Sequence, residues 1–169
     1  MIFVNKIYFI AALSLLTACA PIRYFGANLF NTSSYERYVT SLKKAGMAET
    51  SMGEDWLAAG ARALTDTNYV NIPLDEIAYF ASNRIDAKSY RFELEKGRNM
   101  EVEIKTFPRD LLLFIDLFEY SADTDKYIFV PIQKTDDRTY TYNIKQSGEF
   151  VLRVQPQILT GGRYGIRIK

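Results

Sequence analysis

Histidine is absent from the 169-residue sequence, and cysteine occurs once, at position 19. Without histidine the chain lacks the commonest general base of enzymes and the commonest zinc ligand of proteins. A single cysteine excludes an internal disulfide and a cluster of thiolate ligands. The sequence also contains no glycine-rich phosphate loop, nucleophile elbow or HExxH motif. We therefore expect no catalytic residues of these kinds and predict that the chain is not an enzyme.

An excess of either charge is also missing, because 21 lysine and arginine residues balance 20 aspartate and glutamate residues. A nucleic-acid partner would require a basic stripe, so we expect none. Outside the N-terminus the most apolar run covers residues 111–120, LLLFIDLFEY, which is too short to cross a bilayer. A short run that is apolar on both faces, with Pro108 just upstream, is typical of a central strand buried on both sides.

The N-terminal segment, residues 1–19, has the pattern of a bacterial lipoprotein signal. Lys6 precedes an apolar stretch, which ends in the lipobox-like sequence LTAC. This pattern predicts cleavage before Cys19 and a diacylglyceryl group on its sulfur. The alternative is an ordinary secretory signal or an anchor helix with a chance cysteine. Ala20 replaces the aspartate that retains enterobacterial lipoproteins in the inner membrane, which implies an outer-membrane address facing the periplasm. Residues 20–32 are interpreted as a tether from the lipid anchor.

Two amphipathic helices are predicted to form a hairpin over residues 33–66. Capping boxes mark the two helix starts, with Ser33 and Ser51 as N-caps, and Gly46 is the expected C-cap of the first helix. The hairpin is either a partner-binding or lid element, or a cap that packs on the following domain through Trp56. We favour the second interpretation, because amphipathic helices usually bury their apolar stripe in their own domain.

From residue 70 onward the hydrophobic pattern changes from helical spacing to alternation. Seven or eight short segments alternate apolar and polar side chains between turn signals, which predicts a β-sandwich of jelly-roll or immunoglobulin-like kind over residues 70–169. Segments 90–95 and 100–105 are expected to pair as a hairpin with one solvated face. The predicted fold class is mainly β, a sandwich preceded by a two-helix hairpin.

Acidic residues near the predicted central strand are the candidate site residues. Asp116, Asp123 and Asp125 are weak candidates for a calcium site, because calcium takes six to eight oxygen ligands. No EF-hand spacing is present and aspartate is an ordinary turn residue, so we expect no cofactor. Asp116 also interrupts an apolar strand. A buried arginine partner would explain it, and an active site shared with Glu119 is the alternative.

Several stretches carry a family resemblance: YERYVTSLKKAGMAETSMGEDWLAAGARAL at 35–64, VNIPLDEIAYF at 70–80, YRFELEKGRNMEVEI at 90–104, LLFIDLFE at 112–119 and GEFVLRVQPQILTGGRY at 148–164. Together they resemble the non-catalytic N-terminal region of bacterial lysostaphin-type zinc metallopeptidases, which cut peptidoglycan cross-bridges. The sandwich half also resembles the pre-peptidase C-terminal type of jelly roll. In those peptidases a catalytic domain follows, with zinc held by HxxxD and HxH motifs. The present sequence has no histidine, so none of those residues can be transferred to it.

The resemblance implies a non-catalytic module, either the front part of a longer peptidase or an accessory protein encoded alone. As an envelope lipoprotein it would position a peptidoglycan peptidase or occlude its cleft. Its partners would be the membrane, through the lipid anchor, and the peptidase or murein. The alternative is a glycan- or small-ligand-binding sandwich with structural calcium. Tyrosines could line such a glycan platform, although most of them fall on the inward phase of the alternation, where core packing explains them better.

Overall fold

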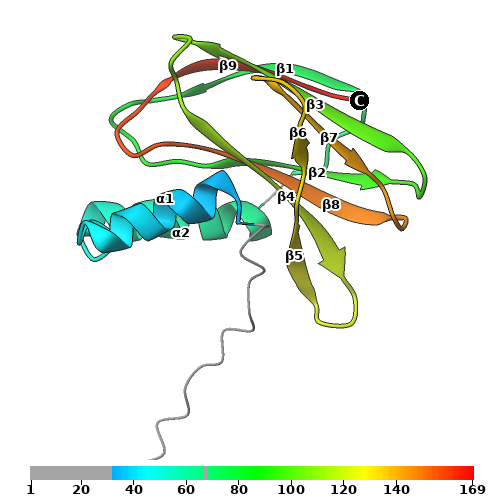
Figure 1. The fold of residues 1–169 in the computed structure, drawn as a ribbon, viewed down its shortest axis with the longest axis horizontal. Helices are drawn as coiled ribbons and strands as arrows, with labels where there is room; N and C mark the ends of the chain where they lie inside the picture. Colours follow the sequence, from blue (N-terminus) through cyan, green and yellow to red (C-terminus); the bar gives the residue numbers. More distant parts are fainter. Residues whose placement is uncertain (1–31, 67) are drawn as a thin grey trace, which may run out of the picture.

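The computed structural model describes residues 32–66 and 68–169, in which two helices precede nine strands (Figure 1). The predicted lipobox with Cys19 and most of the tether lie outside the described residues. The helices are α1 (Ser34–Lys44) and α2 (Ser51–Thr65). The strands are β1 (Leu74–Phe80), β2 (Lys88–Leu94), β3 (Asn99–Phe107), β4 (Leu113–Ser121), β5 (Lys126–Val130), β6 (Gln133–Lys134), β7 (Thr139–Asn143), β8 (Gly148–Pro156) and β9 (Gly162–Ile168). Within the described residues, no helix has the length and apolarity needed to span a membrane.

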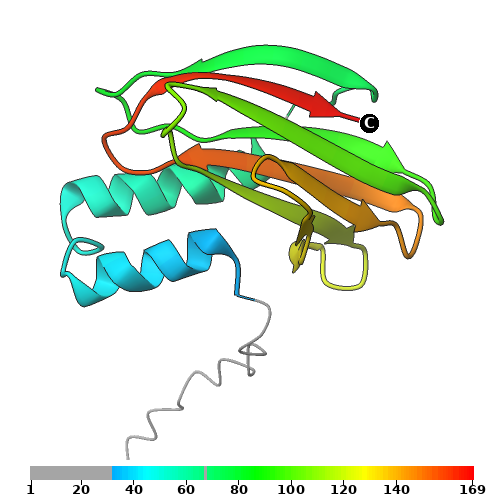
Figure 2. The ribbon, with the colours of Figure 1, turned by 45° about the horizontal axis from the view of Figure 1, so that its top comes forward.

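The strands form two antiparallel sheets that face each other as a sandwich (Figure 2). One sheet has the order β1-β9-β3-β7-β6 and the other has the order β2-β8-β4-β5. Apolar side chains from alternate positions fill the space between the sheets, and Phe92, Phe150 and Tyr164 are among the most buried. The predicted fold class, a mainly β sandwich preceded by a two-helix hairpin, is confirmed. The structure has nine strands in the described residues where seven or eight were expected, and the additional strand is β6, which has only two residues.

The expected hairpin between segments 90–95 and 100–105 is wrong. β2 pairs with β8, whereas β3 pairs with β7 and β9. The turn at Gly97, whose φ of 84° favours glycine, therefore carries the chain from one sheet to the other. The alternation of apolar and polar residues determines which side chains are buried, but it does not determine which strands pair with each other. The two apolar rows meet across the core instead of lying side by side.

The predicted central strand is confirmed as β4, which lies between β8 and β5. Its first six residues are all buried. Ile115 and Leu117 point into the sandwich core, whereas Phe114 belongs to a second cluster beneath the helices. The strand is apolar on both faces because the other sheet covers one face and the helical hairpin covers the other.

The helix boundaries follow the capping chemistry, with two corrections of one residue each. Ser33 caps α1 as predicted, its Oγ accepting a hydrogen bond from the N–H of Glu36 at 3.1 Å. The predicted C-cap at Gly46 is wrong by one residue, because Ala45 is the C-cap of α1 and Gly46 follows it in the left-handed conformation, with a φ of 68°. The predicted N-cap at Ser51 is wrong, because Thr50 caps α2 and accepts from the N–H three residues later at 3.1 Å. Two adjacent hydroxyl residues both suit an N-cap, and the backbone conformation selects between them.

The hairpin packs on the outer face of the four-stranded sheet, with α1 over β4 and α2 over β8 and β2 (Figure 2). Trp56 anchors it there, as predicted. Its indole stacks on Tyr35 with 4.9 Å between ring centroids, and its Nε1–H donates to the carbonyl of Pro156 at 2.9 Å. The side-chain amide of Gln155 donates in turn to the carbonyl of Trp56 at 2.8 Å. The helices are therefore fixed to β8 by both apolar and polar contacts.

Arg153, on β8, contacts three other elements beneath the hairpin: β4, α2 and α1. Its Nη2 donates to Oδ2 of Asp116 at 2.6 Å, and its Nη1 donates to the carbonyl of Gly60 in α2 at 3.1 Å. The guanidinium also lies 3.8 Å from the ring centroid of Tyr35 in α1. Asp116 thus has the arginine partner that its place in an apolar strand predicts.

Gly60 lies at a point where α2 packs tightly against β8 and α1. A Cβ atom at this position would lie 2.5 Å from Oε1 of Gln155 and 2.6 Å from the hydroxyl of Tyr35. Both side chains are held by the buried network, so a larger residue would push the helix away from the sheet. The glycine therefore sets the distance between the hairpin and the sandwich.

Candidate functional site

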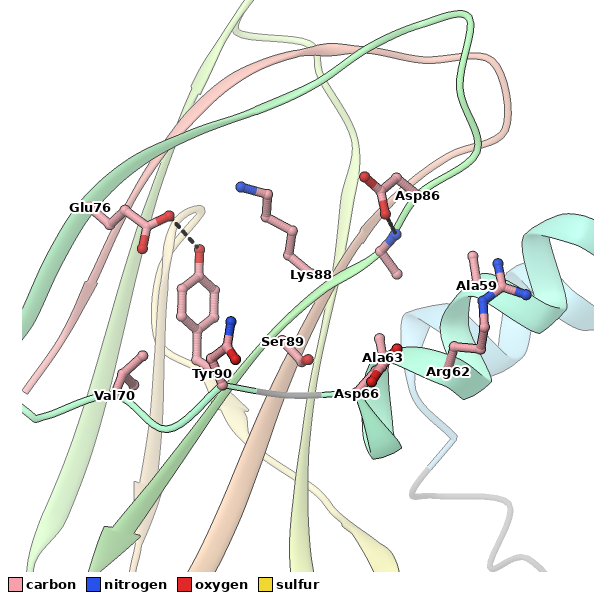
Figure 3. Close-up of a pocket in the computed structure, with 12 residues that line it drawn as sticks. Ala59, Arg62, Ala63, Asp66, Val70, Glu76, Asp86, Lys88, Ser89 and Tyr90 are labelled. Carbon is pink, nitrogen blue, oxygen red and sulfur yellow. Dashed lines mark hydrogen bonds between the residues drawn. The ribbon is translucent and has the colours of Figure 1, made fainter.

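A cavity of about 510 Å³ lies where the end of α2 meets one edge of the sandwich (Figure 3). We call it the junction pocket. β1 forms an edge of the five-stranded sheet and β2 forms an edge of the four-stranded sheet, so the sandwich is open on this side. The polar lining comes from α2, β1, β2 and the segment before β2, and includes Arg62, Asp66, Glu76, Asp86, Lys88 and Tyr90. The volume falls within the range of small-ligand pockets.

Strand geometry places two opposite charges on the inner walls of this pocket. Along β1, Glu76 shares its face with the buried Ala78 and Phe80, which point into the core. Along β2, Lys88 shares its face with Tyr90, which also belongs to the core. Each charged residue therefore lies on the inward phase of an edge strand. Figure 3 shows both side chains beside the ring of Tyr90.

Tyr90 connects the pocket to the interior of the sandwich. Its hydroxyl lies 3.4 Å from Oε1 of Glu76 and 3.0 Å from the hydroxyl of the fully buried Tyr164. A carboxylate can only accept, so Tyr90 donates to Glu76 and Tyr164 donates to Tyr90. Burial is the main cause that raises the pKa of Tyr90 to about 12, and burial likewise raises the pKa of Tyr164. Both phenols are therefore neutral donors at physiological pH.

The charged groups of the pocket differ in whether they already have partners of opposite charge. Asp86 is occupied, because Oδ2 accepts from Arg84 at 2.7 Å and Oδ1 accepts from a backbone N–H at 3.0 Å. Arg62, Asp66, Glu76 and Lys88 form no ion pair with any residue of the described ranges. Two cations and two carboxylates therefore remain available to a bound molecule.

The sequence-predicted site residues lie elsewhere and do not form one group. Asp116 is buried in its ion pair with Arg153, whereas Asp123 and Asp125 are exposed in the turn between β4 and β5. Oδ1 of Asp125 accepts from the hydroxyl of Tyr120 at 2.7 Å. In residues 32–66 and 68–169, no three carboxylate, thiol or imidazole groups are gathered where they could hold a metal ion.

Asp116 and Glu119 cannot act as a catalytic pair in this fold. They are three residues apart on β4, so their side chains leave opposite faces of the sheet. Asp116 points toward the helices and Glu119 points toward the other sheet. Sequence reasoning missed Glu76 and Lys88 instead. The sequence could have indicated them, because each is a charged residue that alternates in step with the apolar, buried residues of its strand.

A second candidate surface covers one end of the five-stranded sheet. Within the described part of the chain, no helix packs on its outer face (Figure 2). Here Ile77, Tyr79 and Phe107 are 79%, 57% and 58% exposed. Arg163 lies between Tyr79 and Phe107 in the cross-strand register, and Gly165 lies beside Ile77. We call these three apolar residues and Arg163 the outer-face patch.

The charges next to the outer-face patch neutralise one another. Arg167 bridges Asp75 on β1 and Glu103 on β3, at 2.7 Å and 3.4 Å. Lys105 also contacts Glu103, at 2.9 Å. Arg163 has no ion-pair partner within the described part of the chain. The patch is thus apolar with one available guanidinium, a composition typical of protein interfaces.

Comparisons with known proteins identify no family. No family model matches the chain, and no curated protein matches it. Among solved structures, the pre-peptidase C-terminal domain of a collagenase from Bacillus anthracis matches with a TM-score of 0.49 and 12% identity, covering 61% of this chain and 94% of that domain. The periplasmic inhibitor of g-type lysozyme from Aeromonas hydrophila matches with a TM-score of 0.38 and 13% identity, covering 61% and 96%. The inhibitor from Salmonella Typhimurium matches with a TM-score of 0.36 and 16% identity, covering 61% and 98%.

Proposed function

We propose that this chain is a non-catalytic accessory module of the bacterial cell envelope that binds a peptidoglycan-cleaving metallopeptidase and positions it or occludes its cleft. The observation that carries the proposal is the outer-face patch. The outer face of the opposite sheet is covered by the helical hairpin, whereas Ile77, Tyr79 and Phe107 are left in solvent on one contiguous face. Large apolar side chains gathered in this way favour a protein partner.

The chemistry of the partner follows from the charges around the patch. Because the neighbouring ion pairs are already neutralised, the complementary surface is an apolar one with a carboxylate opposite Arg163. The resemblance to the non-catalytic region of lysostaphin-type peptidases directs the choice of partner to that class of enzyme. The absence of histidine leaves the zinc chemistry to the partner or to a catalytic domain in the same polypeptide.

The predicted lipid anchor on Cys19 would hold the module at the membrane. In a host that carries the chain and is fed labelled palmitate, the native protein should incorporate the label, and the C19S variant, which has no thiol to acylate, should not. Equal incorporation in both, or no incorporation in the native protein, would contradict lipid anchoring at this residue. This test concerns location and is independent of the partner.

The test of the docking function is capture of the peptidase by the full chain. Chemical crosslinking in intact cells, followed by affinity purification and mass spectrometry, should recover a lysostaphin-type peptidase. The substitutions I77K and Y79K should abolish the crosslink, because each places a polar chain in the apolar contact. The matched control is I128K, which changes an apolar residue that is 50% exposed on β5, away from the patch. Equal recovery from I77K and I128K, or recovery of no peptidase, would refute the proposal.

A further inference from the structure

We infer that the junction pocket binds a small zwitterionic molecule, an amino acid or short peptide that offers one carboxylate and one ammonium group. This inference goes beyond the docking function and does not depend on it. The pocket lies at the open edge between β1 and β2, whereas the outer-face patch lies on the solvent side of the five-stranded sheet. The two surfaces can therefore be tested separately.

The first argument is the position of Glu76 and Lys88. Both lie on inward-facing positions of edge strands, where their neighbours on the same face are core residues. Both are partly buried, and a partly buried charge is stabilised by an opposite charge nearby. Glu76 and Lys88 nevertheless form no ion pair with each other, since their charged atoms are more than 4.0 Å apart. A molecule between them could satisfy both at once.

The second argument is the balance of charge in the lining. Asp86 is neutralised by Arg84, which leaves the cations Arg62 and Lys88 and the carboxylates Asp66 and Glu76. These four groups sum to zero net charge. A simple anion would be repelled by the carboxylates and a simple cation by the two basic groups. A zwitterion can place each of its charges beside the opposite one.

The third argument is that hydrogen bonds fix the orientation of the Tyr90 hydroxyl and of the Glu76 carboxylate in the pocket. Tyr164 donates to Tyr90 and Tyr90 donates to Glu76, so the hydroxyls are committed and Glu76 remains the acceptor that faces the cavity. The Tyr90–Glu76 bond is long at 3.4 Å, which leaves acceptor capacity on the carboxylate for an ammonium group. Lys88, from the same strand as Tyr90, then faces the ligand carboxylate. The cavity of about 510 Å³ is large enough for a dipeptide.

The experiment is calorimetric titration of the full chain, purified in detergent, with four compounds. Alanyl-alanine carries both charges, N-acetyl-alanyl-alanine lacks the ammonium group, alanyl-alanine amide lacks the carboxylate, and free alanine is the shorter zwitterion. We expect saturable binding of alanyl-alanine and at least about tenfold weaker binding of both capped peptides, because each loses a charged hydrogen bond. Tighter binding of alanine than of the dipeptide would identify an amino acid as the ligand, and the reverse order a peptide.

Substitutions identify the groups that hold each end. K88M should weaken alanyl-alanine at least about tenfold while leaving the weak binding of the amide unchanged, because the amide has no carboxylate for Lys88. E76Q should likewise weaken the binding of alanyl-alanine at least about tenfold, because its ammonium group loses a carboxylate partner, and should leave the binding of the acetylated peptide unchanged. The control K105M removes an exposed lysine on β3 and should change nothing. Circular dichroism verifies that each variant folds. No saturable binding of alanine or alanyl-alanine, equal binding of capped and uncapped peptides, or native affinity in K88M and E76Q would overturn the inference.

Discussion

Removing the carboxylate of Asp116 should destabilise the protein more than removing any other carboxylate named above. In the native structure the Asp116 and Arg153 side chains are 1% and 6% exposed and lie 2.6 Å apart. The substitution D116A leaves the guanidinium in the same buried place without its counter-charge. Arg153 cannot move to solvent without giving up its bond to the carbonyl of Gly60 and its contact with Tyr35.

The magnitude follows from the burial of the pair. Breaking a buried ion pair by removing one partner costs about 3–5 kcal/mol of unfolding free energy, because a desolvated charge is left uncompensated. For a chain of this size, 1 kcal/mol corresponds to roughly 2–4 °C in Tm, so we expect a fall of about 6–20 °C. The substitution D116N should cost less, since the amide oxygen still accepts the hydrogen bond from Arg153.

The chain supplies a matched control in a second arginine–aspartate pair of nearly the same length. Asp75 and Arg167 lie 2.7 Å apart but are 64% and 48% exposed. D75A should therefore cost no more than about 1 kcal/mol. Urea unfolding followed by circular dichroism measures both variants. If D116A and D75A lost the same amount of stability, burial of the Asp116 pair would not be the source of its contribution, and the reasoning would fail.

Three further predictions follow from the packing and the pocket. G60A should lower the unfolding free energy by about 1–3 kcal/mol, because its Cβ meets two held side chains, whereas G148A, with no atom within 4 Å of the new Cβ, should be near neutral in the same urea assay. W56F should cost about 1–3 kcal/mol, because it leaves a buried carbonyl without its donor; wild-type stability would show that water replaces the indole N–H. The pKa of Tyr90 is raised to about 12 in the folded state, so the unfolded chain ionises first and stability should fall as the pH rises from about 10 toward 12. Absorbance titration of Y90F beside the native chain checks this, and an unchanged high-pH transition would contradict it.

The central strand and the helix starts could be predicted because they depend on local sequence. The run at 111–120 places apolar side chains on both faces of its strand, so both faces had to be covered, as they are over the first six residues of β4. Asp116 within it required a partner for the same reason, and arginine was the natural expectation. The strand partners could not be predicted in this way. Segments 90–95 and 100–105 look like a hairpin, yet β2 and β3 belong to different sheets.

The candidate site was predictable only in part. Asp116, Asp123 and Asp125 are candidates because they are acidic and close in sequence, but Asp116 is buried within β4, whereas the other two lie in the exposed turn after that strand. Glu76 and Lys88 are 12 residues apart on strands of different sheets, and no local pattern in the sequence links them. Their significance depends on the two edge strands facing each other across the same opening.

By itself, the sequence determined the periodicity of each segment, the residues that had to be buried, the helix caps within one residue, and the lack of histidine chemistry. These properties depend on side-chain chemistry and on spacing over a few residues. The tertiary structure decided which strands are neighbours, that Arg153 on β8 is the partner of Asp116 on β4, and that Glu76 and Lys88 line one pocket. Pairing partners are separated by many residues along the chain, and several pairings bury the same apolar rows. The choice among them rests on the packing of the whole molecule.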